Sequence, residues 1–499
     1  MTDHLISFND ARSDLLACSA FLAESIKSSD GRSEALMAVV PQYLAKGDVD
    51  LAAELANTAG DPFTRDRLLI LVAEKCAELN DDEYALQLAY AIEDYGLQSQ
   101  ARERIALRKA SQGDFEKARV IADEIDHPDS VIAGIAIKQD ADGDMDGALK
   151  TIGEIGFPGA AVYALTSMAV ARLEAGEQDN SVGLLENASA AADDIEHNEE
   201  KIRALSDIGN LFIEAKRNDR AIETFDKARA NAETLDNIHR DAFLAAISLG
   251  FLRAGSIDLA DRTLDLVADK TQMATALLGF ARELWRRDEK NEALEALEES
   301  YAILKSQRES ETRDSKAKFA LFTSIAAQFA GFDKGERAIG IAQEIVDENE
   351  QMSALGQIAQ VLTIQKKEDL AKQAIRAIQE DASRVFALIG VSDGANENGE
   401  KETAKSFLEE AAVLTETVPQ LASRTSAYIG IAKRFKNFGD MTRMREISLL
   451  NLETIATIRD ESSRAAALAN LAELYDEAKF ELGGREKEIL VEMVRKAAI

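Results

Sequence analysis

The stretch Gly47-Asp48-Val49-Asp50-Leu51-Ala52 contains the pattern that determines the fold, because the pattern recurs along the chain. A Gly-Asp pair or a near equivalent returns at intervals, and a small or apolar residue stands five places after each glycine. The pairs are Gly47 and Ala52, Gly113 and Ala118, Gly143 and Ala148, Gly176 and Ser181, Gly255 and Ala260, Gly399 and Ala404, and Gly439 and Met444. In degenerate copies another residue replaces the glycine: Asn80 before Ala85, Lys216 before Ala221, Asp288 before Ala293, Asp333 before Ala338, and Lys366 before Ala371.

These twelve small residues are spaced 33, 33, 30, 33, 40, 39, 33, 45, 33, 33 and 40 residues apart. A repeat of this period is typical of solenoids, in which each unit buries its apolar face against its neighbours. The longer spacings predict longer helices and connections within the repeat rather than domain breaks.

Each copy of the pattern predicts an antiparallel helical hairpin. Before the turn, apolar residues recur at three- and four-residue spacing, as at Leu68, Leu71 and Val72. The glycine takes the left-handed conformation that ends a helix, and the Asp or Ser after it can cap the next one. The small residue lies where the second helix crosses the first, because a large side chain there would push the helices apart. Pro62, Pro128 and Pro158 are expected where the second helix ends.

The composition agrees with a helical chain. Its 499 residues are 46% hydrophobic but only 6% aromatic, and they include only 5 prolines, which disfavours a sheet protein. Lys and Arg number 58 against 90 Asp and Glu, so the formal charge is −32, which argues against a nucleic acid or an anionic membrane as the partner. Two cysteines and an N-terminus without the features of a signal peptide lead us to expect a cytoplasmic protein.

The unit resembles the tetratricopeptide repeat (TPR), and residues 202–235 resemble it most. The residues that stand at the key positions of this family are Leu205, Ile208, Gly209, Phe212, Ala221, Phe225 and Ala228. The stretch departs from the family at Leu205, where Trp is usual, and at Glu233, where Pro is usual. The resemblance covers roughly residues 30–480 and implies an all-α fold, a right-handed α-solenoid of about twelve antiparallel helical hairpins wound into a TPR-like superhelix.

The expected organisation is a solenoid with a helix at each end. We predict an N-terminal capping helix in residues 1–30, a first arm of repeats in 31–304, a polar connection in 305–317, a second arm in 318–480 and a C-terminal capping helix in 481–499. The connection, which begins at Lys305, could act as a hinge between the arms or could belong to one rigid superhelix.

No convergent set of catalytic groups is visible, so the chain is predicted not to be an enzyme and to need no cofactor. The histidines match no metal motif, and Cys18 and Cys76 lie on apolar helix faces. The acidic stretch from Asp142 to Asp146 follows the opening of a calcium loop but lacks the Glu at its twelfth position, which is Gly153. A solvated turn that caps a helix is the preferred interpretation there, and calcium binding is the alternative.

The resemblance implies that the first helix of each hairpin lines a concave surface, and the sequence is therefore interpreted as a protein–protein interaction scaffold that binds a protein or peptide there. The alternatives are a structural or self-assembling protein that pairs through its ends or its convex face and, more remotely, an all-helical enzyme. The candidate partner-binding residues are Arg67, Glu74, Arg104, Arg203, Asp207, Asn210, Arg282, Gln357, Gln360 and Lys433.

Overall fold

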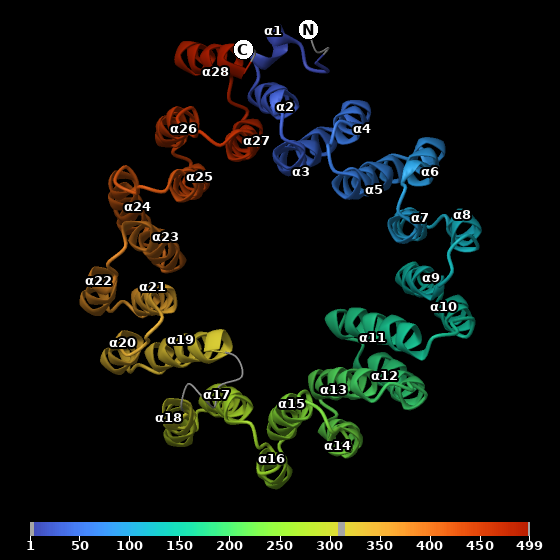
Figure 1. Cartoon of the computed structure of the whole chain (residues 1–499). Coiled ribbons are helices and arrows are strands. Elements are labelled where there is room, and N and C mark those ends of the chain that lie inside the picture. Colours follow the sequence, from blue (N-terminus) through green and yellow to red (C-terminus); the bar gives the residue numbers. More distant parts are fainter. Residues whose placement is uncertain (1–3, 308–314, 498–499) are drawn as a thin grey trace. The chain divides into compact units, whose positions relative to one another are not determined.

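A computed structural model describes residues 4–307 and 315–497, and every regular element in these ranges is an α-helix (Figure 1). The helices in the first part of the chain are α1 (Phe8–Ala11), α2 (Leu15–Ser25), α3 (Ser29–Lys46), α4 (Val49–Asn57), α5 (Pro62–Glu78), α6 (Asp82–Ala91), α7 (Tyr95–Ser111), α8 (Phe115–Ala122), α9 (Asp129–Ala141) and α10 (Met145–Ile152). The next are α11 (Pro158–Glu174), α12 (Gln178–Asp193), α13 (Asn198–Glu214), α14 (Asn218–Glu233), α15 (Arg240–Arg253), α16 (Ile257–Leu264), α17 (Lys270–Arg286) and α18 (Lys290–Ser306). The last are α19 (Ser315–Gly331), α20 (Gly335–Gln343), α21 (Glu348–Ile364), α22 (Glu368–Ala377), α23 (Asp381–Glu397), α24 (Lys401–Thr415), α25 (Leu421–Asn437), α26 (Met441–Ile455), α27 (Glu461–Ala478) and α28 (Gly484–Ala497).

Helices α3 to α26 form twelve consecutive hairpins within the described residues, as the sequence predicts. An odd-numbered helix is the first of each hairpin and the following even-numbered helix is the second. First helices of successive hairpins pack against one another, as α11 does on α9 and α13. The fold is therefore an all-α solenoid.

All twelve predicted turns between the helices of a hairpin adopt the left-handed conformation. The seven glycines of the pattern have φ between 76° and 91°, and the five residues that replace glycine elsewhere have φ between 59° and 66°. A thirteenth left-handed residue, Lys479 with φ of 54°, ends α27. The repeat pattern thus located every hairpin turn, including those without glycine.

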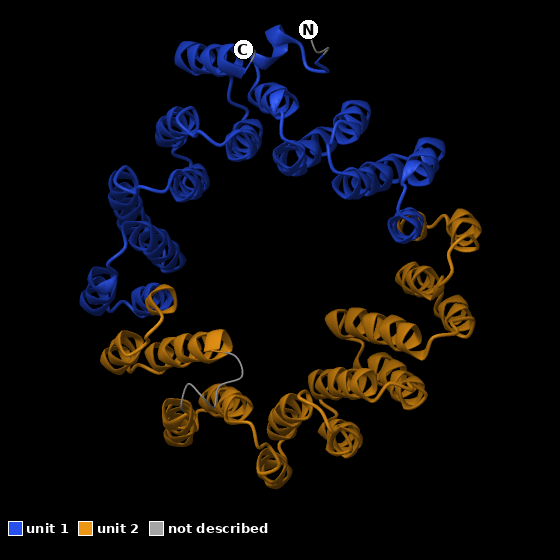
Figure 2. Cartoon of the chain, viewed as in Figure 1, with its two compact units in different colours: residues 1–105, 352–499 blue, residues 106–351 orange. Residues whose placement is uncertain are grey.

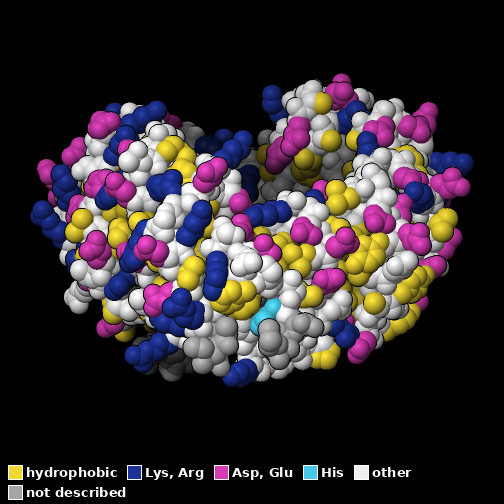
Figure 3. Space-filling model, turned by 90° about the horizontal axis from the view of Figure 1, so that it is seen from above, with side chains coloured by type: hydrophobic (Ala, Val, Ile, Leu, Met, Phe, Trp, Pro, Cys, Tyr) yellow, Lys and Arg dark blue, Asp and Glu magenta, His cyan; other side chains and the backbone are white. Residues whose placement is uncertain are grey.

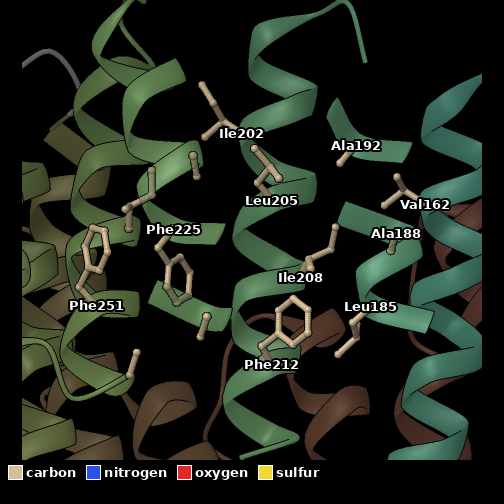
Figure 4. Close-up of a cluster of buried hydrophobic side chains, with 14 of the residues drawn as sticks. Val162, Leu185, Ala188, Ala192, Ile202, Leu205, Ile208, Phe212, Phe225 and Phe251 are labelled. Atoms are coloured by element: carbon tan, nitrogen blue, oxygen red, sulfur yellow. The ribbon is translucent and has the colours of Figure 1, made fainter. Parts of the chain in front are cut away.

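The residue five places after each turn lies in the core, as its predicted place between the two helices requires. All twelve of these side chains, including Ser181 and Met444, are no more than 2% exposed. Around them lie larger apolar side chains. Figure 4 shows several of these, Phe212 and Phe225 among them, in a cluster between neighbouring helices.

The two lengths of the repeat come from the second helix. Second helices of 8 to 10 residues belong to the units with short spacing. Those of 15 to 17 residues, such as α12 and α24, fall in the units with spacings of 39 to 45 or in the last hairpin. The prediction that longer helices explain the longer spacings is confirmed.

The three prolines of the pattern have a different position from the one predicted. Pro62 and Pro158 are the first residues of α5 and α11, and Pro128 is the N-cap of α9. A proline suits the start of a helix because the N–H that it lacks would have no partner in the helix. These residues therefore begin the next hairpin rather than end the previous one.

The chain divides into two compact units, which Figure 2 distinguishes by colour. Unit 1 comprises residues 1–105 and 352–499, and unit 2 comprises residues 106–351. In each unit the first helices lie on the inner side of the curve and the second helices on the outer side (Figure 1). Of the predicted polar connection 305–317, residues 308–314 lie outside the described residues, and the predicted arms on its two sides stay a prediction.

Both terminal segments belong to unit 1. The predicted capping segment 1–30 holds α1 and α2, and α2 packs against both α3 and α27. The predicted segment 481–499 holds α28, which packs against α2 and α26.

Candidate partner-binding surface

The predicted partner-binding residues all lie on first helices, and each is at least partly accessible to solvent. They divide between the two units. Unit 1 contains Arg67, Glu74, Arg104, Gln357, Gln360 and Lys433, and unit 2 contains Arg203, Asp207, Asn210 and Arg282.

Three of the predicted residues in unit 1 are engaged in ion pairs between neighbouring first helices. The guanidinium of Arg104 on α7 lies 3.2 Å from the carboxylate of Glu74 on α5. Lys433 Nζ on α25 lies 4.0 Å from Glu473 Oε2 on α27. Exposed pairs of this kind contribute about 0–1 kcal/mol each, so a partner can rearrange them at little cost.

In unit 2 the predicted residues contact their own helix or a neighbouring first helix. Asn210 Nδ2 donates to the carbonyl of Ser206 one turn earlier on α13. The guanidinium of Arg203 lies 5.7 Å from the centre of the Phe243 ring, and Arg282 Nε donates to Gln328 Oε1 at 2.7 Å. Desolvation by the surrounding helices raises the pKa of Asp207 and lowers the pKa of Arg282.

The inner face of unit 1 has a hollow of about 470 Å³ between α25 and α27. Its two walls come from these neighbouring first helices, and Glu34 of α3 lies at its margin. The side chains that give it its chemical character are Ser426, Ile429 and Lys433 from α25 and Ala466, Ala467, Asn470 and Glu473 from α27. The hollow therefore combines an apolar wall with an amide and two opposite charges.

The hollow exists because two neighbouring helices carry small residues at the same place. Ser426 and Ala466 are the sixth residues of α25 and α27, whereas the sixth residue of α23 is Phe386, which is 45% exposed. A side chain as large as Phe386 on either helix would fill the space. Asn470 makes no side-chain hydrogen bond among the described residues, so both its donor and its acceptor face solvent there.

Sequence reasoning identified only Lys433 of this set. It missed Asn470 and Glu473 because the repeat pattern ends at Met444, and α27 follows the last recognised unit. The signal that could have located α27 is its own left-handed turn residue, Lys479. Five places later stands a small residue, Gly484, but it is exposed at the start of α28 rather than buried within a second helix.

Figure 3 shows lysine and arginine side chains interspersed with aspartate and glutamate over the visible face. Many of these charges pair between neighbouring second helices, as Arg220 does with Glu186 and Lys227 with Asp193 in unit 2, each at 2.7 Å. The net charge of −32 is thus distributed over the solvated surface.

The acidic turn from Asp142 to Asp146 is occupied with local interactions. Asp144 caps α10 by accepting from the N–H of Gly147 at 2.9 Å, and Asp142 pairs with Lys138 one turn earlier. Across residues 4–307 and 315–497 no three His, Cys, Asp or Glu side chains are grouped so that they could hold a metal ion. The same ranges contain no helix with both the length and the apolar character needed to cross a membrane.

No family profile matches the chain, and no curated protein matches it. Solved structures resemble it weakly. The kinesin light chain of Podosopora anserina with nearly identical TPR-like repeats shares 18% identity over 45% of this chain and 100% of its own, with a TM-score of 0.24.

A second solved structure is the apo quorum sensor NprR of B. thuringiensis, which shares 14% identity over 72% of this chain and 100% of its own, with a TM-score of 0.26. A third is Naa15/Naa10 bound to HypK-THB, which shares 14% identity over 80% of this chain and 65% of its own, with a TM-score of 0.27. The fold of this chain follows instead from its own hairpins. With left-handed turns at a fixed place and small buried residues at the helix crossings, it is a TPR-like helical repeat.

Proposed function

We propose that the chain is a non-enzymatic scaffold that binds a protein or peptide segment on the inner surface formed by its first helices. The observation that carries this proposal is the hollow between α25 and α27. Repeat arrays of this kind present long surfaces built from successive hairpins. A hollow between two neighbouring first helices of such a surface can hold an extended segment.

The chemistry of the hollow suits a peptide. Its volume of about 470 Å³ lies within the range of roughly 300–1,000 Å³ that is usual for ligand sites. Ile429 and Ala467 offer an apolar wall for a side chain, and the amide of Asn470 can both donate to and accept from a peptide backbone. Lys433 and Glu473 can each exchange their exposed ion pair for a charged group of the partner.

The experiment is a selection of displayed peptides against the full-length chain, followed by measurement of Kd by calorimetry. The variant Ser426→Trp fills the hollow with an indole and is expected to weaken binding of the selected peptides by at least about tenfold, or about 1.4 kcal/mol.

The matched control is Ser353→Trp. Ser353 is the sixth residue of α21, as Ser426 is of α25, and it is also exposed, but it lies outside the hollow. This variant is expected to keep Kd within about twofold of the unaltered chain, since a factor of two is under 0.5 kcal/mol. Peptides that bind both variants and the unaltered chain equally well would exclude the hollow as the binding site.

A further inference from the structure

Helix α27 ends in the way that the first helix of a hairpin ends, but the second helix expected to follow it is absent from its side. In a regular hairpin, such as α21 with α22, the second helix begins two residues after the left-handed residue Lys366. After Lys479, α28 does not begin until Gly484, and it packs on α2 and α26. Helices α2 and α3, from residues 1–105 of unit 1, pack along α27 instead.

One buried hydrogen bond shows that α2 occupies the place of a second helix. Ser19 Oγ on α2 donates to the carbonyl oxygen of Ala465 on α27 at 2.7 Å. In the regular hairpin of α17 and α18, Ser300 Oγ donates to the carbonyl oxygen of Ala274 at the same distance. Ala465 and Ala274 are both the fifth residue of their helix, and each serine lies seven residues before the C-cap of its own helix.

The connection from α2 to α3 also follows the regular pattern. The carbonyl of Ile26, at the C-cap of α2, accepts from Nε and Nη2 of Arg32 at 3.1 and 2.8 Å. Between α22 and α23 the carbonyl of Ile378 accepts from the same two atoms of Arg384 at 3.2 and 2.8 Å. Chain direction and contacts thus continue from α27 through α2 to α3 as from one repeat to the next.

Further contacts hold α3 against α27. Ser462 Oγ lies 2.8 Å from both Glu34 Oε2 and Asp460 Oδ2, which share its one hydroxyl hydrogen, and Lys46 Nζ lies 2.7 Å from Asp476 Oδ2. Nine consecutive residues of α2, Leu15 to Ala23, are buried. We call the pair formed by α27 and α2 the composite hairpin, because its two helices come from opposite ends of the chain.

We propose that the composite hairpin is a latch, in which α2 separates from α27 as a unit while the covalently connected hairpins stay folded. In a regular hairpin the short turn keeps the second helix at a high effective concentration beside the first. No such turn joins α27 to α2, whose contact at Ser19 and Ala465 spans 446 residues of chain. Helix α2 keeps its short connection to α3 but has none to α27, so it is held by one link where a regular second helix is held by two. The composite hairpin is therefore the local unit with the lowest opening free energy in unit 1.

Two buried cysteines allow this latch to be tested in the intact chain. Cys18 lies on α2 and Cys76 on α5, and both are free and fully buried in unit 1. Burial raises the pKa of the Cys18 thiol to about 12 and that of the Cys76 thiol to about 11, so neither reacts appreciably until its helix opens. Their alkylation rates therefore compare the opening of the composite hairpin with that of a regular one.

The experiment treats the full-length chain with excess iodoacetamide under native conditions and follows both cysteine-containing peptides by mass spectrometry. Cys18 is expected to react at least about tenfold faster than Cys76, which corresponds to a difference of about 1.4 kcal/mol in opening free energy. Equal rates, or faster reaction of Cys76, would overturn the proposal.

A pair of matched variants separates the latch from general loosening. Ser19→Ala removes the hydrogen bond across the composite hairpin and is expected to speed Cys18 about fivefold without changing the rate of Cys76. Alanine suits the place of Ser300, which is seven residues after the small residue Ala293, since Ala188, Ala228 and Ala411 stand seven residues after the corresponding residue of their own second helices and are buried there. Ser300→Ala removes the equivalent bond in a connected hairpin and is expected to leave the Cys18 rate unchanged. Acceleration of both cysteines by Ser19→Ala, or of Cys18 by Ser300→Ala, would contradict the latch.

Discussion

At the scale of single residues, the fold depends on a left-handed residue at each turn and a buried small or apolar residue five places later. The sequence predicted both, even at Lys216 and Asp288, because the spacing to the small residue is kept where the glycine is not. Lysine and aspartate have φ of 59° and 65° at these two turns, a conformation that costs an L-residue about 1–2 kcal/mol. The surrounding helices must supply this free energy.

Replacement of one such residue by glycine is therefore expected to stabilise the chain. Lys216→Gly relieves the backbone strain but increases the entropy of the unfolded chain, and the net gain is expected to be about 0.5–1 kcal/mol. The measurement is the midpoint of thermal unfolding followed by circular dichroism. The reverse change, Gly255→Ala at φ of 89°, should lower the midpoint. A lower midpoint for Lys216→Gly would show that its side chain contributes more than its backbone conformation costs.

A second residue-scale feature is the close passage of the Phe225 ring between α13 and α15. A Cβ built on Gly209 would lie 2.7 Å from this ring, and one on Gly250 would lie 2.6 Å from it. The Phe225 ring also meets the Phe251 ring at a centroid distance of 5.8 Å in an edge-to-face arrangement. The two glycines thus make room for the Phe225 ring of α14 to pack between α13 and α15.

Gly209→Ala is expected to destabilise the chain by about 1–3 kcal/mol, because the added methyl group displaces the buried ring. The control is Gly183→Ala, a glycine on the exposed face of α12 with no atom within 4 Å of its added Cβ. That change is expected to be neutral or stabilising, since alanine is the better helix former. Urea unfolding of both variants, compared by midpoint, gives the result, and equal midpoints would show that the ring has room to move.

At the scale of elements, helix caps fix where first helices begin. The carboxylate of Asp460 at the N-cap of α27 accepts from the N–H of Ser463 at 2.7 Å and from the hydroxyl of Ser462 at 2.8 Å. The hydrogen bonds from Ser463 and then from Ser462 lower the pKa of Asp460. The same helix forms one wall of the hollow and one half of the composite hairpin, so its start matters to both.

Asp460→Ala is expected to lower the stability of α27 by about 1 kcal/mol at pH 7. Because the pKa of Asp460 is depressed in the folded state, the stabilisation by its carboxylate is present above the unfolded pKa near 3.9 and is lost as the pH falls through the folded value. The difference between the melting midpoints of the two proteins should therefore shrink below about pH 4. Asp460→Asn, which keeps an acceptor at every pH, is the control, and a difference that persists unchanged at pH 2 would contradict the assignment.

The elements also show where sequence reasoning stops. The hairpins and their two lengths could be predicted because each is specified by residues within 45 positions of one another. The pairing of α2 with α27 could not, since no local period joins residues 446 positions apart. For the same reason the hollow was missed except for Lys433, because its other wall stands on a helix outside the recognised pattern.

At the scale of the whole molecule, a net charge of −32 acts against the ion pairs that join neighbouring helices. Pairs such as Lys227 with Asp193, at 2.7 Å, are exposed and individually weak. Self-repulsion of the excess carboxylates extends over the whole chain and is screened by salt over about 8–10 Å. We expect repulsion to dominate the salt dependence.

The melting midpoint is accordingly expected to rise by several degrees when NaCl is raised from about 10 mM to about 150 mM at pH 7, because salt screens the repulsion. Repetition with sodium sulfate at equal ionic strength separates screening from surface exclusion, which sulfate enhances. A midpoint that falls with NaCl would show that the ion pairs between helices outweigh the net charge.

The composite hairpin also has a consequence for biosynthesis. Each regular hairpin can fold soon after it is synthesised, because its two helices are adjacent in the chain. Helix α2 is made before α27, which follows 446 residues later, and at 5–20 residues per second this is a delay of roughly 20–90 s. During this interval the side of α2 that α27 covers in the finished protein is open to other chains. The period of greatest aggregation risk is therefore set by translation speed and ends when α27 has been synthesised.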